Sequence, residues 1–297
     1  MRSRRRALLL YGSRFADGTL LCRVQWAGMV NPGLIEAVGR LYEGIAPPTA
    51  AFSSDELRKD REYFTASVWR YAVTLDRLGA ACGHPLHDTA VLDIGAFPGH
   101  LAALLSRNDR ANVTAVTLVT SEAFERHMRS LGVGVTVCDV ECGSLPATDR
   151  SIDVVLCCEL LEHLEGDVRH ILAEARRVVR DEGLLLLTTP NHASLAHRWA
   201  LARGRSVYPT LDHPDYPFYA GAGVRNPMRH IREFTADEIA DLLGQARFSR
   251  ISVDTVSPPL AAGRALSWRG ALVNRVLHYS QALVVNGGGL IVATARP

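Results

Sequence analysis

The chain has 297 residues, enough for one large catalytic domain with an appended helical segment and a core that needs no disulfide bonds. Hydrophobic residues make up 47% and charged residues 22%, an ordinary globular balance, and no apolar run approaches the span of a bilayer. The formal charge of +2 would not attract a polyanion, so neither a nucleic acid nor a membrane is the expected partner.

The six cysteines form no paired CxxC spacing, which favours reduced thiols in a cytoplasmic protein over a zinc site. The basic run at 2–6 has the charge of a signal peptide, but the apolar stretch after it is broken at 11–14. We interpret it as a flexible or surface-lying tail.

Residues 1–87 are expected to form an N-terminal extension ahead of a catalytic domain at 88–297. Gly and Pro interrupt residues 1–50 so often that no regular element is predicted there, only an arm or a segment that wraps the core. A capping signal at Ser53 and Glu56 then opens a helix whose apolar positions recur up to Leu78. We expect this helix to cover a pocket.

From residue 90, short β-branched or leucine-rich runs alternate with helices, which predicts crossover connections and a mostly parallel sheet. Seven strands are expected, at 90–94, 112–118, 133–138, 152–158, 183–188, 249–255 and 289–295. The expected fold class is therefore a doubly wound α/β sheet. Such a fold binds ligands at the carboxyl ends of its strands.

The first of these strands enters a glycine turn and then a helix, in the sequence VLDIGAFPGH at 91–100. Gly95 lacks the Cβ that would keep a ligand from the backbone, and Gly99 lets the helix start pack closely, although both also fit an ordinary turn. A dinucleotide fingerprint needs a glycine where Phe97 stands, and the Gly-Lys-Ser or Gly-Lys-Thr of a phosphate loop does not occur. The pattern therefore excludes both of these nucleotide-binding motifs.

The turn instead resembles motif I of the class I S-adenosylmethionine-dependent methyltransferases. The resemblance continues through CDVE at 138–141, LP at 145–146 and SIDVVLCC at 151–158, and it covers about residues 88–256. It implies a Rossmann-like enzyme whose methyl donor is S-adenosylmethionine. The implied cofactor-binding residues are Asp93, Gly95, Ala96, Phe97, Gly99, Thr117, Asp139, Val140 and Cys157.

In the family, Asp93 would help to hold the methionine ammonium, Asp139 would accept from the adenine amino group, and the backbone of Cys157 would meet the methionine. Asp139 also fits a simple helix or turn cap. The chain departs from the family at Thr117, where an acidic residue usually accepts both ribose hydroxyls. A single hydroxyl cannot form that charge-assisted pair, so ribose binding is weaker or is supplied elsewhere, with Glu122 as a candidate.

The sequence ELLEH at 159–163 would place two carboxylates and an imidazole on one face of a helix start. It resembles the metal motif of the small-RNA 2′-O-methyltransferases and the ubiquinone-pathway O-methyltransferases, in which a later histidine completes the site. The resemblance implies a divalent cation, Mg²⁺, Mn²⁺, Fe²⁺ or Zn²⁺, that would lower the pKa of a substrate hydroxyl. Its ligands would be Glu159, Glu162, His163 and His230.

Without a metal, both carboxylates would be solvated, and His163 would line the pocket floor or orient the substrate. His163 is then the best catalytic base and His192 the second.

The fifth strand leads to His192, and roughly forty residues pass before His230, which is long for a connection in a compact domain. We expect this insertion, at 190–230, to form the acceptor pocket or its lid, although it also fits a loop packed by its own aromatic residues. Its aromatic residues are Tyr208, Tyr216, Phe218 and Tyr219. The strand end TTPN and the sequence HIREFT at 230–235 resemble methyltransferases of bacterial polysaccharide and secondary-metabolite pathways.

The hypothesis is an O-methyltransferase for a small hydroxylated acceptor, such as a sugar or a secondary metabolite, with or without a divalent cation. A metal-free N- or C-methyltransferase is one alternative. A partner protein that binds S-adenosylmethionine without turnover is the other, motivated by Thr117. The stretch 258–288 matches no named element, and 267–279 fits a second lid or a contact between two copies, which leaves a homodimer open.

Overall fold

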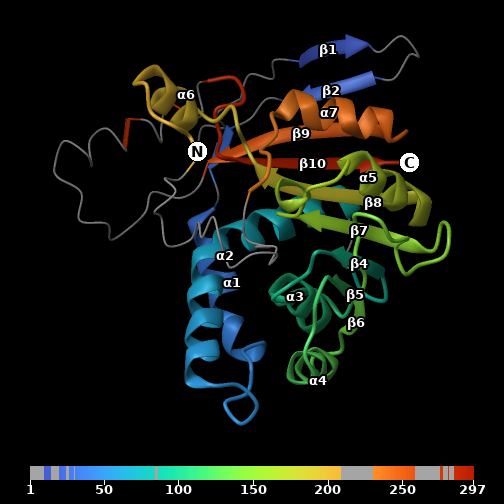
Figure 1. The fold of residues 1–297 in the computed structure, drawn as a ribbon. Coiled ribbons are helices and arrows are strands. Elements are labelled where there is room, and N and C mark those ends of the chain that lie inside the picture. Colours follow the sequence, from blue (N-terminus) through green and yellow to red (C-terminus); the bar gives the residue numbers. More distant parts are fainter. Residues whose placement is uncertain are drawn as a thin grey trace, which may run out of the picture.

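The computed structural model describes residues 10–14, 20–24, 27–29, 31–83, 86–208, 230–257, 275–276, 280 and 284–297. One large sheet carries helices on both faces, and a two-stranded hairpin lies along its β9 side (Figure 1). In the described part of the chain, no helix combines the length and apolarity needed to cross a membrane.

The large sheet has eight strands in the order β3-β9-β10-β8-β7-β4-β5-β6. Their bounds are β3 Ala27–Met29, β4 Ala90–Ile94, β5 Asn112–Thr117, β6 Gly134–Val137, β7 Ile152–Cys158, β8 Val179–Pro190, β9 Ser249–Ser257 and β10 Leu290–Arg296, while the hairpin consists of β1 Leu10–Arg14 and β2 Leu20–Val24. Strand β10 is antiparallel to both β8 and β9, and the other pairs in this sheet are parallel. The predicted doubly wound, mostly parallel sheet is confirmed.

All seven expected strands form, with ends shifted by a few residues at most of them. Residues 1–50, for which the sequence predicted only an arm or a segment that wraps the core, supply the hairpin, the edge strand β3 and the first helix. Strand β3 pairs in parallel with the last three residues of β9, so its partner lies far away in the sequence. The first helix begins after Asn31, whose side chain accepts from the amide of Gly33.

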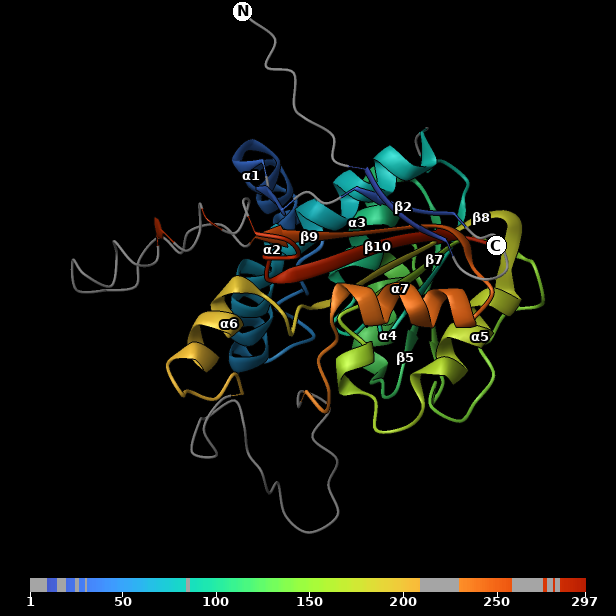
Figure 2. The same ribbon diagram turned by 90° about the horizontal axis from the view of Figure 1, so that it is seen from above.

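The helices are α1 Pro32–Arg40, α2 Ser54–Cys82, α3 His100–Asp109, α4 Glu122–Ser130, α5 Val168–Val178, α6 Leu195–Ala202 and α7 Ala236–Gln245, with 3₁₀ turns at Tyr42–Gly44 and Leu161–His163. Helix α2 begins at the predicted capping box, in which Ser53 and Glu56 satisfy each other's backbone amides, and it ends at Gly83. Helices α2 and α3 lie on one face of the sheet and α5 and α7 on the other (Figure 2).

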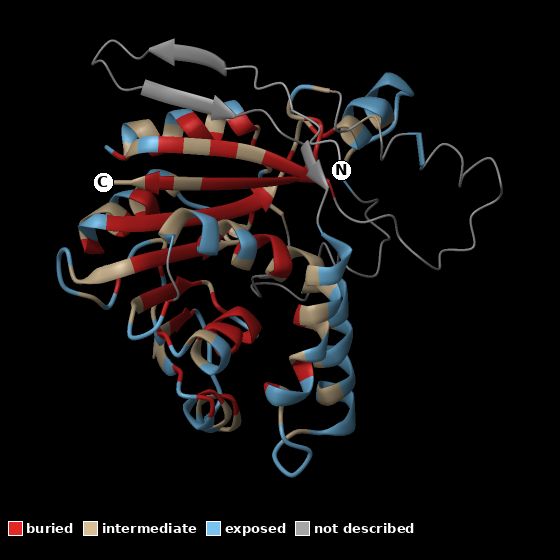
Figure 3. Ribbon diagram, turned by 180° about the vertical axis from the view of Figure 1, so that it is seen from behind, coloured by how far each residue is buried: buried red, intermediate tan, exposed pale blue. Residues whose placement is uncertain are grey.

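The central strands are buried on both faces, and they appear between partly exposed helices in Figure 3. In β4, Val91 joins the core beneath α2 and α3, whereas Leu92 and Ile94 join the core beneath α5 and α7. Burial on both sides explains why this strand is a continuous apolar run in the sequence. It also leaves the carboxyl ends of the strands as the place where polar side chains meet.

Asn191, which directly follows β8 and is fully buried, stabilises the carboxyl end of β8 through side-chain hydrogen bonds. Its Nδ2 donates to the carbonyls of Asn286 (2.8 Å) and Gly288 (2.7 Å), and its Oδ1 accepts from the amide of Ala193 (3.0 Å). Its backbone forms a parallel bridge with Phe234. This residue therefore joins β8, the approach to β10 and the segment before α7.

Replacing Asn191 by Ala is expected to lower the free energy of unfolding by about 3 kcal/mol, because one buried and one partly buried carbonyl lose their donor. The matched control is Asn108→Ala, which removes one bond to the carbonyl of Leu104 on the surface of α3 and is expected to cost under about 1 kcal/mol. Urea unfolding followed by circular dichroism measures both. Equal losses in the two variants would contradict the role given to Asn191.

Candidate active site

The glycine turn after β4 holds the backbone in a conformation that favours glycine at two positions. Gly95 has a φ of +75° and Gly99 a φ of +89°. A Cβ on Gly95 would lie 2.8 Å from Cδ1 of Leu160, and one on Gly99 would lie 2.6 Å from Cε of Met128. Gly95 thus keeps the gap between β4 and the end of β7 narrow, and Gly99 lets the start of α3 pack on α4.

A cleft opens beside this turn at the carboxyl ends of β4, β7 and β8, and helix α2 forms its other wall. Its lining residues are Tyr63, Arg70, Tyr71, Thr74, Asp93, Gly95, Ala96, Phe97, Pro98, His100, Leu101, Cys158, Glu159 and Thr188. Four predicted cofactor-binding residues, Asp93 and 95–97, lie in this one cleft. Helix α2 contributes Tyr63, Arg70, Tyr71 and Thr74 to this lining, and its role as a cover stays a prediction.

Asp93 is 3% exposed, and burial raises the pKa of its carboxyl to about 7. A buried carboxylate at this position would be stabilised by a positively charged group in the cleft. The position therefore suits the ammonium of the methionine moiety.

Cys157, in contrast, is buried within the sheet, and its neighbours Cys158 and Glu159 line the cleft. The prediction concerns the backbone of Cys157, which lies directly before these two residues, and it stays a prediction.

Further along the same edge, the residues expected to meet adenine and ribose lie at the ends of β5 and β6. The hydroxyl of Thr117 is buried and has no hydrogen-bond partner among the described residues. Asp139 is exposed and its Oδ1 accepts from the amide of Glu141, so it caps its own turn, while its contact with adenine stays a prediction. Val140 is buried in the core. Glu122 lies on the surface at the start of α4 and pairs with Arg126, and its role as a substitute ribose acceptor stays a prediction.

Three apolar side chains at this edge are exposed, namely Leu118, Val119 and Val137. Strand residue Val137 pairs with Thr117, and Leu118 and Val119 directly follow Thr117 in the chain, so all three lie close to the residue that the resemblance assigns to the ribose. Exposed apolar groups together mark a binding surface. These residues were not predicted from the sequence, although apolar residues directly after a parallel strand were the available signal.

Glu159 does not join the other predicted metal ligands. Its φ of +52° turns the chain, and its carboxylate pairs with Arg70 of α2 (2.6 Å) and accepts from the hydroxyl of Thr188 (2.9 Å). The residues after it form a 3₁₀ turn, Leu161–His163, in place of the expected α-helix start. The prediction that Glu159 and Glu162 share one helix face is therefore wrong.

The remaining three predicted ligands, Glu162, His163 and His230, offer atoms that all lie within 4.8 Å of one another. Glu162 is fully buried, and its Oε2 accepts from the hydroxyl of Thr189, but its Oε1 has no hydrogen-bond partner in the described part of the chain. Burial, and then the charge of Glu159, raise the pKa of Glu162 well above its usual value. This carboxyl needs either a proton or a cation, and the three side chains suit a divalent metal.

The backbone holds these ligands together across a long sequence separation. The amide of Ile231 donates to the carbonyl of Glu162 (2.6 Å), and the amide of His192 donates to the carbonyl of Phe234 (2.9 Å). His192, the second predicted base, lies with its Nδ1 3.8 Å from Oε2 of Glu233. Within the predicted insertion, 209–229 lies outside the described residues, as do Tyr216, Phe218 and Tyr219; most of 258–288 lies outside them as well.

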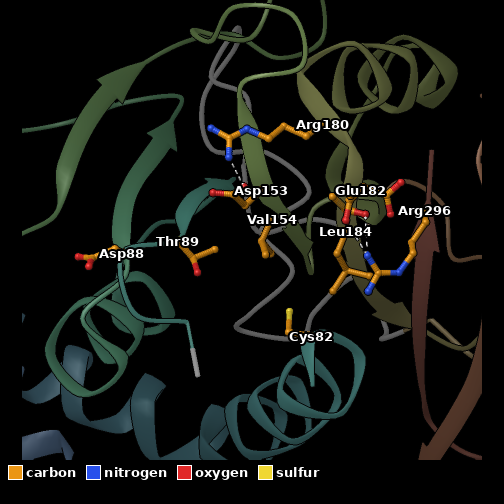
Figure 4. Close-up of a pocket in the computed structure, with 10 residues that line it drawn as sticks. Cys82, Asp88, Thr89, Asp153, Val154, Arg180, Glu182, Leu184 and Arg296 are labelled. Carbon is orange, nitrogen blue, oxygen red and sulfur yellow. Dashed lines mark hydrogen bonds and ion pairs between the residues drawn. The ribbon is translucent and has the colours of Figure 1, made fainter. Parts of the chain in front are cut away.

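Two further cavities lie among the described residues, one beside the cleft and one at the opposite edge of the sheet. One of about 480 Å³ adjoins the cleft and shares Tyr63, Phe97, Pro98 and His100 with it. The other, of about 250 Å³, lies at the amino ends of β7 and β8, where Arg180 pairs with Asp153 near Cys82 (Figure 4). Because ligands of this fold class bind at the carboxyl edge, the cavity in Figure 4 is not the expected active site.

Comparison with known proteins identifies the class to which this fold and cleft belong. A family model described as a methyltransferase domain matches residues 92–187. A Mycobacterium tuberculosis protein named as a probable S-adenosylmethionine-dependent methyltransferase is 30% identical over 226 residues, which are 73% of this chain and 70% of the relative. The chain belongs to the class I S-adenosylmethionine-dependent methyltransferases, and S-adenosylmethionine is its methyl donor.

Two other similar proteins are more distant. A ubiquinone biosynthesis O-methyltransferase of Parvibaculum lavamentivorans is 28% identical over 131 residues, covering 44% of this chain and 51% of that protein. The crystal structure of an S-adenosylmethionine-dependent methyltransferase from Archaeoglobus fulgidus gives a TM-score of 0.49 at 15% identity, covering 76% of this chain and 94% of that chain.

Proposed function

We propose that this methyltransferase methylates an oxygen of a small hydroxylated acceptor, such as a sugar or a secondary metabolite, with a divalent cation held by Glu162, His163 and His230. The observation that carries the proposal is the fully buried carboxylate of Glu162, whose Oε1 lacks a hydrogen-bond partner among the described residues. Two imidazoles offer nitrogen atoms within 4.8 Å of it. A bound cation would supply Lewis acidity that lowers the pKa of an acceptor hydroxyl.

The other residues of the cleft would bind and orient the donor. Asp93 would hold the methionine ammonium, and Asp139 with Val140 would lie at the adenine. The buried hydroxyl of Thr117 offers a single hydrogen bond to the ribose. The ion pair of Arg70 with Glu159 ties α2 to the end of β7 and would keep water from the donor, since both side chains line the cleft.

Domain organisation belongs to the same proposal. Residues 1–87 would act as an extension that covers the donor, and 190–230 would act as the lid over the acceptor. The described part of that insertion includes α6, whose His197 lies 3.6 Å from the carboxylate of Glu233, the same carboxylate that contacts His230, and this position supports its assignment to the acceptor side.

The test is a mass-spectrometric search for a 14-dalton gain among candidate hydroxylated acceptors, run with and without EDTA. With the cation, Glu162→Gln is expected to lower the rate by about 100-fold or more and to remove the sensitivity to EDTA, because the buried carboxylate ligand is lost. The control is Glu182→Gln, an exposed carboxylate at the opposite edge of the sheet, which should keep the full rate.

A product that forms equally well with EDTA would favour metal-free transfer, with His163 as the base. The pairing of Glu159 with Arg70 supports this metal-free alternative, because it leaves three of the four predicted metal ligands close together. Donor binding without any product would instead favour a binding protein without turnover.

A further inference from the structure

A second cluster of potential ligands lies beside the first and was not anticipated from the sequence. It consists of His192, His197 and Glu233, whose ligand atoms also lie within 4.8 Å of one another. His192 follows the end of β8, His197 is in the first turn of α6, and Glu233 precedes α7. Three separate elements therefore converge on one point.

The backbone fixes this convergence. The parallel bridge between Asn191 and Phe234 brings His192 next to Glu233. Ser194 caps α6 by accepting from the amide of His197 (3.3 Å), which sets the direction of that helix at its start. The cluster thus rests on the same buried residues that close the sheet edge.

Glu233 is the residue that points to a ligand. Its side chain is 9% exposed, and its Oε2 has no hydrogen-bond partner among the described residues, as is also true of Nδ1 of His192. These two atoms are 3.8 Å apart, and Nδ1 of His197 lies 3.6 Å from the same oxygen. Buried polar atoms that face one another beyond hydrogen-bond distance have not satisfied their bonding capacity.

Those separations fit a shared cation. Two ligand atoms about 2.0 to 2.1 Å from one tetrahedral metal are about 3.3 Å apart, so a small inward movement would complete the site. Two imidazoles with one carboxylate form a ligand set typical of zinc, iron and similar transition metals, whereas Mg²⁺ and Ca²⁺ prefer oxygen ligands. His197 would exchange its contact with the carbonyl of His192 (3.1 Å) for the metal.

The second cluster also contacts the first. Nδ1 of His230 lies 3.0 Å from Oε1 of Glu233, so one oxygen of this carboxylate serves His230 while the other faces His192 and His197. A carboxylate that orients a metal-binding histidine is a common arrangement. Here the same carboxylate has a second oxygen available to a second ion.

We propose that His192, His197 and Glu233 bind a divalent transition-metal ion of their own, next to the Glu162–His163–His230 group and joined to it through the contact of His230 with Glu233. The competing possibility is that the second cluster only positions His230 and holds no ion. The inference goes beyond the methyl-transfer proposal, because it depends on these ligand atoms and not on the nature of the acceptor.

The experiment counts bound ions directly. Bound metal is removed from the protein with EDTA, and after dialysis the protein is titrated with Co²⁺. Visible absorption reports the ligands around the Co²⁺, and elemental mass spectrometry gives the number of ions bound per chain. We expect two equivalents in the wild type, one equivalent in His192→Gln and in His197→Gln, and one equivalent in Glu162→Gln. The control His87→Gln, at an exposed histidine, should keep two.

The outcomes are separable from those of the proposed function. A wild type that binds no ion, or whose ion is lost in Glu162→Gln but kept in His192→Gln and His197→Gln, overturns the second site. A single ion that is lost in His192→Gln and kept in Glu162→Gln supports the second site and counts against the first. Circular dichroism and titration with S-adenosylmethionine accompany every variant, so that a misfolded His197→Gln is recognised and His192→Gln decides the matter. Failure to find an acceptor leaves the ion count unaffected, and an ion count of one leaves methyl transfer intact.

Discussion

Replacing Gly95 by Val is expected to weaken binding of S-adenosylmethionine by at least about 100-fold, which corresponds to about 2.7 kcal/mol. The residue lines the cleft together with Asp93, and its φ of +75° is one that a β-branched residue adopts only with strain. A Cβ at this position would already lie 2.8 Å from Cδ1 of Leu160, so the two added methyl groups must occupy the gap between β4 and β7. Isothermal titration calorimetry with the donor and its demethylated product measures the loss.

The control has to separate strain from obstruction, and Gly83 allows this. It has nearly the same backbone conformation, with a φ of +70°, but a Cβ added there would meet nothing within 4 Å, and the residue is at the far end of α2. Gly83→Val should therefore lower the free energy of unfolding through backbone strain alone, by less than Gly95→Val, and leave donor affinity unchanged. Unimpaired binding in Gly95→Val would place the methionine elsewhere.

The sheet could be predicted because its strands carry local signals. The apolar runs from β4 to β10 are bounded by turn residues, and the box of Ser53 with Glu56 lies within four residues. The edge strand β3 could not be predicted, since it has three residues and obtains its hydrogen bonds from β9, more than 200 residues later. Short strands of this kind depend on pairing that no local pattern encodes.

The site divides in the same way. The glycine turn was predictable, because a positive φ and the close approach of neighbouring side chains both favour glycine at 95 and 99. The ion pair that draws Glu159 away from the other predicted metal ligands could not be predicted, because its partner Arg70 lies 89 residues earlier in the chain. The cluster around Glu233 was missed for a similar reason: only the pairing of Asn191 with Phe234 brings its members together.

Asp93 leads to an expected pH dependence of donor binding. Burial raises the pKa of its carboxyl to about 7 in the free protein, so below that pH the group is neutral and cannot pair with the ammonium of the donor. Affinity should fall by up to about tenfold for each pH unit below 7. It should fall again above about pH 8, where an α-amino group of ordinary pKa loses its proton. Calorimetry from pH 5.5 to 9 is expected to give a bell-shaped profile.

Asp93→Asn should remove the acidic limb of that profile and weaken binding at pH 7.5, while making the free protein more stable. The sign follows from the direction of the shift: a carboxyl whose pKa is higher in the folded state than in the unfolded state destabilises the fold as pH rises through that interval. Removing the charge would therefore raise the free energy of unfolding by up to about 4 kcal/mol at pH 8 and leave it nearly unchanged at pH 4.

A matched control is Asp109→Asn at the end of α3, where partial burial also raises the pKa of the carboxyl but no cofactor-binding residue lies nearby in the sequence. It should increase stability to a smaller degree and leave the binding profile intact. If only Asp93→Asn gains stability and loses donor affinity, the carboxylate of Asp93 destabilises the fold and serves to bind the donor. If Asp93→Asn keeps the acidic limb, another group must titrate there, and Asp93 cannot be the partner of the ammonium.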